Sequence, residues 1–553
     1  MSLNLPKIQP THPDETKPGL NKINVHQPAT NTIHPMIMEK DVPVRMKDGA
    51  TLYLNVFRPE KEGKFPVVIS ADVYGKDRPA TDTYSIRTYL GSISHSMFTA
   101  FESPDPAFWV PEDYVVIKVA LRGSQNSEGN LLPMSSSVEA QDYYELIEWA
   151  GVQKWSNGNV GMNGVSYLAM TQWMVAALNP PHLKAMIPWE GLSDMYREMA
   201  FHGGIPCTKF FRDWSNRQYH RWGEERVEDM VVRQSEHPLF DEYWEDRASK
   251  LGDIEVPMYV VASWSTQGLH NRGTLEGFKQ SASKHKWLEI HGRKEWEYYY
   301  SRQSLERQKR FFDHFLKEID SDWMDTPKVR LEVRDKFYEG EVRSESEWPI
   351  KRTNYTKLYL DGNCFALTEA PIKDEALLSY CIEPQNNESG NLIFNIKFDK
   401  DTELTGYTKL RLWVSADGSD DMDLFVALKK IDRRGMEVHF PDYNHIEDGQ
   451  VAPGWLRVSH RELDPDKSTP YQPWLKHQSL QKLKPGEIVP VDIEILSSST
   501  LFHAGESLRL VISGSEIIYR STGCRHEETV NRGKHLVYVG GQYDSHLLVP
   551  IIP

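Results

Sequence analysis

The sequence predicts an α/β protein that carries a second, all-β domain. Three observations predict this class. Apolar strands without polar alternation, such as VVIS at 67–70 and YVVIKVA at 114–120, are separated by helix-like segments, which is typical of a parallel sheet covered on both faces. Strand patterns stop between residues 190 and 250, where the spacing becomes helical. Beyond residue 327, short strands between Gly, Asp and Asn turns replace the helices, which indicates a β-sandwich or jelly roll.

The elements follow in a definite order. VPVRM and TLYLNVF flank the turn at 47–50 and predict a hairpin. Further strands are expected at 67–70, 114–120, 159–163, 184–189, 257–264 and 287–291, and helices at 138–149, 167–178 and 307–319. The chain therefore divides into an extended N-terminal arm at 1–35, an α/β core at 36–190 and 251–325, a helical cap at 191–250 and a β-sandwich at 326–553.

Composition limits the partners. The 553 residues carry a formal net charge of −15 and no basic stripe, so we expect no nucleic-acid partner. We expect no membrane partner either, because no run of 18 apolar residues occurs and the N-terminus does not read as a signal peptide. Four scattered cysteines favour a reducing, cytoplasmic setting. The proline-rich arm is long enough to embrace a neighbouring subunit, so a homo-oligomer is one hypothesis.

One window carries the strongest chemical signal. NVGMNGVSYLA at 159–169 reads as a strand, a sharp turn and a helix. A serine at such a turn is exposed at the end of the strand, and the next backbone amide points at a developing oxyanion. Ser166 is therefore the candidate nucleophile, although Leu168 stands where a GxSxG pattern has its last glycine. The alternative interpretation is a serine that caps the helix.

Several segments carry a family resemblance. They are SNGNVGMNGVSYLAMTQW at 156–173, ADVYGKD at 71–77, RGSQNSEG at 122–129, GWLRVSHRELD at 454–464, LKPGEIVPVDIEI at 483–495 and FHAGESLRLVIS at 502–513. Together they resemble the CocE/NonD hydrolases, which are cocaine-esterase-like and related to X-Pro dipeptidyl-peptidases. The resemblance covers about residues 40–515. It implies an α/β-hydrolase core with a helical cap and a C-terminal jelly-roll, galactose-binding-like sandwich.

The resemblance also implies roles for individual residues. Ser166 matches the family nucleophile, with Ala169 replacing a glycine, and Tyr167 would lend its backbone N–H to the oxyanion hole. Tyr74 matches the tyrosine whose hydroxyl supplies a second oxyanion donor, a role that suits a phenol in a dry site. A packing tyrosine is the alternative for Tyr74. Relatives commonly have Asp at Ala120, so an ion pair of Arg122 is expected to be absent.

The rest of the triad departs from the family pattern. Thr266 occupies the place of the family aspartate, and the family histidine falls near Glu295. A serine nucleophile needs a base within hydrogen-bond reach. His291, at the end of a strand, is narrowly preferred over His270 for this role, and each is nearly as well explained as an ordinary structural histidine. Either Glu190 or Asp194 is a surrogate acid, although Asp194 also fits a helix N-cap.

These residues predict a serine hydrolase that cleaves a carboxylic ester, or less readily an amide, through an acyl-enzyme on Ser166. One alternative is a degenerate hydrolase fold that binds a ligand or partner. Another is an X-Pro dipeptidyl-peptidase or aminoacyl-ester hydrolase, for which no anchor for a free amine is evident beyond Glu190. We expect a small-molecule substrate and no cofactor. We expect no metal, because the polar spacing Asp417, Ser419, Asp421, Asp423 lacks the glycine and glutamate of a calcium loop.

Overall fold

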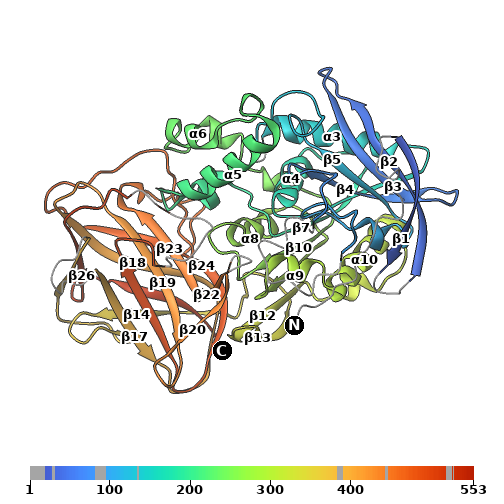
Figure 1. Ribbon diagram of the computed structural model, residues 1–553. Coiled ribbons are helices and arrows are strands. Elements are labelled where there is room, and N and C mark those ends of the chain that lie inside the picture. Colours follow the sequence, from blue (N-terminus) through green and yellow to red (C-terminus); the bar gives the residue numbers. More distant parts are fainter. Residues whose placement is uncertain are drawn as a thin grey trace, which may run out of the picture.

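The chain forms an α/β part and an all-β part that lie side by side (Figure 1). The computed structural model describes residues 19–27, 32–80, 95–133, 136–382, 390–442, 446–517, 526 and 529–553. Residues 1–18 and 28–31 of the expected arm lie outside this set. Within the described residues, no helix combines the length and apolar character that crossing a membrane requires.

A mixed sheet forms the centre of the α/β part. Its strands are β1 (Gly19–Gln27), β2 (Thr32–Arg45), β3 (Thr51–Pro59), β5 (Val115–Ala120), β4 (Phe65–Asp72), β6 (Ser156–Val165), β7 (Leu183–Trp189), β10 (Met258–Ser263), β11 (Lys286–His291), β12 (Val329–Lys336) and β13 (Glu339–Glu345), in spatial order. From β5 to β12 neighbouring strands are parallel, whereas β1, β2, β3 and β13 pair antiparallel. All the parallel strands therefore end at one edge.

Helices cover both faces of this sheet. Val67 and Ile69 of β4 pack into one core with residues of α3 (Ser137–Gly151) and α4 (Tyr167–Ala176). Val68 points the other way, into a second core with residues of α10 (Arg302–Lys317). Because successive side chains of a strand alternate between faces, an apolar run without alternation requires two apolar layers. Burial on both faces of the sheet explains why these strands appear in the sequence as short, entirely apolar runs.

A mainly helical insertion leaves the sheet after β7 and returns at β10. It contains a π-helical turn (Tyr196–Ala200), β8 (Phe201–His202), β9 (Ile205–Pro206), α5 (Thr208–Trp222), a 3-10 turn (Glu224–Arg226), α6 (Met230–Glu236), α7 (Glu242–Glu245) and a second 3-10 turn (Leu251–Asp253). Phe211 and Trp214 of α5 join the core that also holds α3 and α4 residues. Figure 1 shows α5 and α6 along the top, reaching towards the all-β part.

The all-β part has its own hydrophobic core. Its strands are β14 (Asn354–Asp361), β15 (Ala366–Thr368), β16 (Ala376–Cys381), β17 (Asn391–Lys397), β18 (Thr402–Asp417), β19 (Asp423–Ile431), β20 (Glu437–Val438), β21 (Phe440–Asp442), β22 (Ile446–Gly449), β23 (Ala452–Arg457), β24 (Val489–Phe502), β25 (Ser507–Ser513), β26 (Lys534–Val539) and β27 (His546–Ile552). β18 pairs with β24, β26 and β27, and β25 pairs with β17 and β19, all antiparallel.

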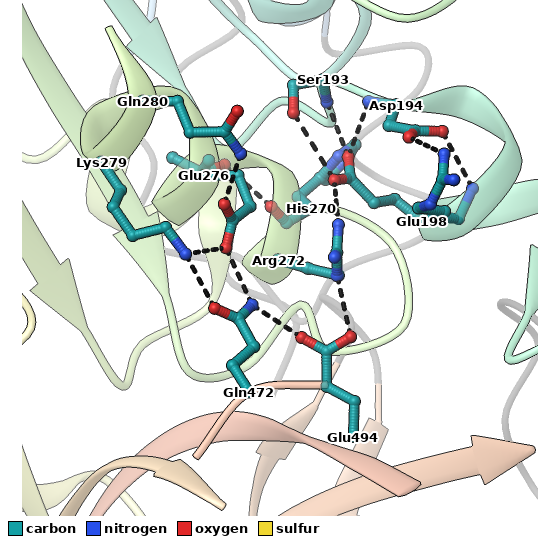
Figure 2. Close-up of polar contacts among 12 residues, drawn as sticks. Ser193, Asp194, Glu198, His270, Arg272, Glu276, Lys279, Gln280, Gln472 and Glu494 are labelled. Carbon is teal, nitrogen blue, oxygen red and sulfur yellow. Dashed lines mark hydrogen bonds and ion pairs between the residues drawn. The ribbon is translucent and has the colours of Figure 1, made fainter. Parts of the chain in front are cut away.

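Buried charges join the two parts. Arg272, in α8 (Asn271–Gln280), donates to Glu198 Oε1 and to Glu494 Oε2 of β24, each at 3.0 Å (Figure 2). Arg334 of β12 donates to Ser498 Oγ at 2.6 Å and to the carbonyl of Val451 at 3.0 Å. A buried guanidinium is tolerated when its donors are satisfied. The all-β part therefore supplies acceptors that the α/β part needs.

The hairpin prediction is confirmed, and one expectation is wrong. β2 and β3 pair antiparallel, with Arg45 opposite Thr51 across the turn. Arg122, in contrast, does form ion pairs: it donates to both carboxylate oxygens of Asp142 at 2.7 and 2.6 Å and lies 2.9 Å from Asp48. Its partners come from α3 and from the hairpin turn, so the residue at position 120 does not decide whether Arg122 is paired.

Candidate active site

Ser166 lies at a sharp turn between β6 and α4. Its backbone has φ 58° and ψ −116°, a strained conformation for a residue with a Cβ. Its amide donates to the carbonyl of Trp189 at 3.0 Å, and its own carbonyl accepts from the amides of Ala169 and Met170 at 2.9 Å. The Ser166 side chain makes no capping hydrogen bond to α4. The backbone thus holds the turn, and the hydroxyl is not used as a helix cap.

Two glycines make room for this turn. Gly164 has φ +156°, and a Cβ there would lie 2.5 Å from the Cβ of Leu168. At Gly191, a Cβ would lie 2.6 Å from the Cβ of Ala169. Both separations are shorter than any real carbon contact. The alanine that replaces the family glycine at position 169 therefore fits because Gly191 faces it.

Two tyrosines lie next to the turn. Tyr167 is the first residue of α4, and its hydroxyl donates to Glu139 Oε1 at 2.7 Å. The phenol of Tyr167 is thus tied to α3, while its amide lies at the N-terminal end of the helix. Tyr74 follows β4, and its ring packs edge-on against the rings of Tyr167, at 6.1 Å, and Phe101, at 5.0 Å. The structure therefore brings Ser166, Tyr167 and Tyr74 to one end of the sheet.

The carboxyl ends of β7, β10 and β11 bring further polar side chains to this edge. Glu190 directly follows β7, Thr266 and His270 follow β10, and His291 ends β11. Glu295 begins the short helix α9 (Glu295–Tyr299). All of these side chains are buried. They form two separate pairs of a histidine and a carboxylate.

Glu190 and His291 form the first pair. His291 Nε2 lies 2.9 Å from Glu190 Oε1, although the angles of this contact are not those of a hydrogen bond. Thr266 donates from its hydroxyl to Glu190 Oε2 at 2.8 Å. The amide of Arg293 donates to His291 Nδ1 at 3.2 Å. Both ring nitrogens of His291 therefore face a protein atom within contact distance.

His270 and Glu295 form the second pair. His270 Nε2 lies 3.7 Å from Glu295 Oε1, and both side chains are 3% exposed. This separation is longer than a hydrogen bond, but a shift of less than 1 Å would bring the two atoms within hydrogen-bond distance. His270 Nδ1 is buried and has no hydrogen-bond partner within the part of the chain that the structure describes. Within the described residues, Nδ1 of His270 and Nε2 of His291 both lack a hydrogen-bond partner, but Nε2 of His291 lies against a carboxylate, 2.9 Å from Glu190 Oε1.

Asp194 has a different environment. It accepts from the amide of Arg197 at 3.1 Å and from its guanidinium at 2.7 Å. Figure 2 shows Asp194 beside Glu198, in the network that leads through Arg272 to Glu494. This arrangement is that of a first-turn helix cap, which was the alternative interpretation for Asp194. Of the two surrogate acids considered, Glu190 is the one that contacts a candidate histidine.

Comparisons with known proteins identify the family. Residues 48–294 match the model of X-Pro dipeptidyl-peptidase (S15 family), and residues 321–548 match that of the X-Pro dipeptidyl-peptidase C-terminal non-catalytic domain. A crystal structure of a CocE/NonD family hydrolase from Staphylococcus aureus superposes with a TM-score of 0.95, is 56% identical, and covers 100% of this chain and 99% of its own. The chain belongs to the CocE/NonD family of hydrolases.

More distant relatives share the whole length of this CocE/NonD hydrolase. Cocaine esterase from Rhodococcus sp. (strain MB1 Bresler) is 25% identical, over 93% of this chain and 98% of its own. An α-amino acid ester hydrolase structure has a TM-score of 0.68 at 16% identity, and covers 100% of both chains. At that identity the likeness shows the fold alone. The two-part architecture is therefore common to proteins of very different sequence.

Burial sets the electrostatics of the two pairs in this CocE/NonD hydrolase. It lowers the pKa of His270 to about 3 and that of His291 to about 3, because a dry environment disfavours the charged imidazolium. Burial raises the pKa of Glu190, against the opposing hydrogen bond from Thr266. Both imidazoles are therefore neutral near pH 7 and able to accept a proton. A Glu190 that holds its own proton would stabilise an imidazolium poorly.

Sequence reasoning overlooked Glu295 as a carboxylate partner. Glu295 stands near the place where the family has its histidine, and His270 follows the strand after which the family has its aspartate. The two residue types thus lie in exchanged positions, 25 residues apart. The order of the two residues in the chain, His270 after one strand and Glu295 after the next, was the signal from which the sequence could have shown this exchange. No group of three or more His, Cys, Asp or Glu side chains among the described residues could hold a metal ion.

Proposed function

We propose that this chain hydrolyses carboxylic esters through an acyl-enzyme on Ser166. The observation that carries the proposal is the strained turn at Ser166, at φ 58°, with Tyr74 and Tyr167 beside it. Strain of this kind is stored where a side chain must be aimed. The similarity to cocaine esterase favours an ester over an amide.

The roles follow from the geometry. Ser166 Oγ attacks the ester carbonyl, and its proton passes to the base. The amide of Tyr167 and the hydroxyl of Tyr74 donate to the oxyanion of the tetrahedral intermediate. Donors of this kind contribute roughly 3–4 kcal/mol each to transition-state stabilisation. The base then protonates the departing alcohol, and a water molecule deprotonated by the same base hydrolyses the acyl-enzyme.

His270 is the base in this proposal, and Glu295 orients it. The support is the available Nδ1 of His270 and the position of Glu295, 3.7 Å from Nε2. Catalytic contacts that are long in a free enzyme often shorten when substrate binds. His291, which the sequence narrowly favoured, has both nitrogens in contact with other groups. Glu190, Thr266 and His291 then form a supporting network beneath the site.

Labelling with a fluorophosphonate, followed by intact-mass analysis, tests these roles. Wild type is expected to gain one adduct, and Ser166→Ala none. His270→Ala is expected to slow labelling about 100-fold or more, with a smaller loss for His291→Ala. His439→Ala is the matched control, because that histidine is 44% exposed and lies in the all-β part. An adduct on Ser166→Ala, or a greater loss from His291→Ala than from His270→Ala, would contradict the assignment.

The match to X-Pro dipeptidyl-peptidase supports a second candidate activity. Alanyl-proline p-nitroanilide, compared with p-nitrophenyl butyrate, distinguishes the two. A Ser166-dependent preference for the dipeptide anilide would replace the esterase proposal. A degenerate fold that only binds a ligand would give no adduct and no turnover.

The organisation of the chain supports a division of labour. The insertion at 191–250 acts as a cap over Ser166, and the all-β part is a jelly roll that shapes the mouth of the site. The sequence placed the start of the sandwich at residue 326, but β12 and β13 continue the α/β sheet to Glu345, so the all-β part begins with β14 at Asn354. The predicted core comprises 36–190 and 251–325 and the predicted arm 1–35, but in the described part of that arm β1 and the start of β2 extend the α/β sheet. The sparse cysteines favour a cytoplasmic location. Deleting 1–18, which precede β1, and measuring mass by light scattering tests whether this segment joins subunits, because an unchanged mass would exclude that role.

A further inference from the structure

Helix α5 of the insertion lies directly against the two tyrosines beside Ser166. The ring of Trp214 stacks on that of Tyr167, at 6.1 Å and an interplanar angle of 2°. Two turns further on, the guanidinium of Arg221 lies 6.0 Å from the centre of the Tyr74 ring. Trp222 Nε1 donates to the carbonyl of Val73, next to Tyr74, at 3.1 Å. One face of α5 is thus fixed over the candidate oxyanion hole.

This face is positively charged. Arg217 and Arg221 are four residues apart on α5 and so lie on the same side of the helix. Arg78, in the loop that carries Tyr74, is close enough to repel Arg221. Among the described residues, the side chains of Arg221 and Arg78 form no hydrogen bond and no ion pair with a carboxylate within 4 Å. Within this described part of the chain, Arg221 and Arg78 therefore lack close anionic partners.

Asp72 is a carboxylate near Arg221 whose Oδ1 is already engaged, while its Oδ2 has no hydrogen-bond partner among the described residues. It is fully buried and accepts from the amides of Tyr74 and Gly75. Burial raises its pKa to about 6, while buried Lys118 and Arg221 act in the opposite direction. Burial, followed by repulsion from Arg78, lowers the pKa of Arg221. Arg221 and Arg78 therefore make no side-chain hydrogen bond to the described residues, in a chain whose formal net charge is −15.

A charged face that is partly withdrawn from water attracts an anion of the substrate more strongly than a surface charge does. Guanidinium groups bind carboxylates through paired, charge-assisted hydrogen bonds. We propose that the ester substrate carries a carboxylate on its acyl chain, and that Arg221 and Arg78 bind this carboxylate beside the oxyanion hole. This inference rests on the proposed esterase function and assigns its substrate class.

A pair of esters that differ only in charge tests the proposal. Mono-p-nitrophenyl adipate has a free carboxylate, and its methyl ester is neutral with the same acyl chain. Wild type is expected to favour the anionic ester by about tenfold or more in kcat/KM, and added NaCl should reduce this ratio. Arg221→Gln is expected to remove most of the preference, and Arg221→Lys to retain part of it. If Arg221 only supported the structure, Arg221→Gln would lower kcat/KM for both esters alike and leave their ratio unchanged.

Lys209→Gln is the matched control. It removes one positive charge from the same helix, but Lys209 pairs with Asp213 at 2.9 Å and lies 12 residues before Arg221. Its charge preference should equal that of wild type. A wild type that favours the neutral ester, or an anionic preference that survives Arg221→Gln, would overturn the proposal.

Binding to Ser166→Ala separates this inference from the proposed function. Titration calorimetry with the anionic ester should show saturable binding that is about tenfold weaker in the double variant with Arg221→Gln. Absence of turnover in wild type together with such binding would refute the esterase function and leave the anion site standing. Equal binding of the anionic and neutral esters to Ser166→Ala would refute the anion site.

Discussion

At the scale of single residues, the site depends on where protons are held. Neutral imidazoles follow from burial, which lowers the pKa of His270 to about 3. Glu295, at the start of α9, lies 3.7 Å from Nε2 of the same imidazole. A carboxylate in that position selects the tautomer and stabilises the imidazolium that forms during reaction. If His270 and Glu295 act as proposed, acid and histidine have exchanged positions along the chain while the same chemistry is kept.

The pH profile of kcat/KM tests this protonation state. In the proposed mechanism the neutral imidazole of His270 is the base, so activity should be lost as pH falls through its pKa in the free enzyme. Because burial lowers the His270 pKa to about 3, the acidic limb should lie well below the ordinary histidine value of about 6.5. Initial rates with a neutral ester from pH 4 to 8 measure it. A limb near pH 6.5 would contradict the assignment of a dry, neutral His270.

At the scale of elements, the sequence predicted where the strands lie better than it predicted which side chains pair between elements. Because both faces of β4 and β5 are buried, these strands appear in the sequence as apolar runs. The turn at Gly164–Ser166 can be recognised in the sequence because a glycine and a serine follow each other closely at the end of a strand. Side-chain pairs between elements leave no such local trace. Asp142 of α3 holds Arg122, and Glu295 of α9 faces His270. Such pairs depend on how strands are ordered in space, which local periodicity does not encode.

The interface between α8 and β24 offers a stability test. Arg272→Ala would leave Glu198, which is 2% exposed, without its partner at 3.0 Å. Removing one member of a buried ion pair costs about 3–5 kcal/mol in the free energy of unfolding. Urea unfolding of both proteins measures the difference. The control is Arg302→Ala, whose guanidinium is 69% exposed and 3.9 Å from Glu306, and which should change stability by less than about 0.5 kcal/mol. Equal effects would contradict the argument.

At the scale of the whole molecule, the α/β part and the all-β part share an interface that the insertion completes. The turn between β8 and β9 places Gly203 against β23 of the all-β part, and the amide of Arg457 donates to the carbonyl of Gly203 at 2.8 Å. Gly203 has φ +56°, and a Cβ there would lie 2.1 Å from the carbonyl oxygen of Trp455. Backbone atoms cannot move aside as a flexible side chain can. The paired glycines at 203–204 therefore mark a close approach of two domains.

Substitution of Gly203 should loosen this approach. Gly203→Ala introduces both a positive φ at alanine and a clash with the backbone of Trp455. Gly435→Ala separates the two effects, because Gly435 has φ +85° and open space around the position of its Cβ. The control is expected to lose about 1 kcal/mol of stability from backbone strain alone. Gly203→Ala should lose clearly more, and it should increase protease cleavage in the insertion because α5 and the β8–β9 turn belong to one segment.

Since α5 also lies over Tyr74 and Tyr167, ester turnover should fall together with this docking, whereas in the Gly435→Ala protein it should not. Equal losses in the two variants would mean that contact between the domains does not hold the insertion over the site.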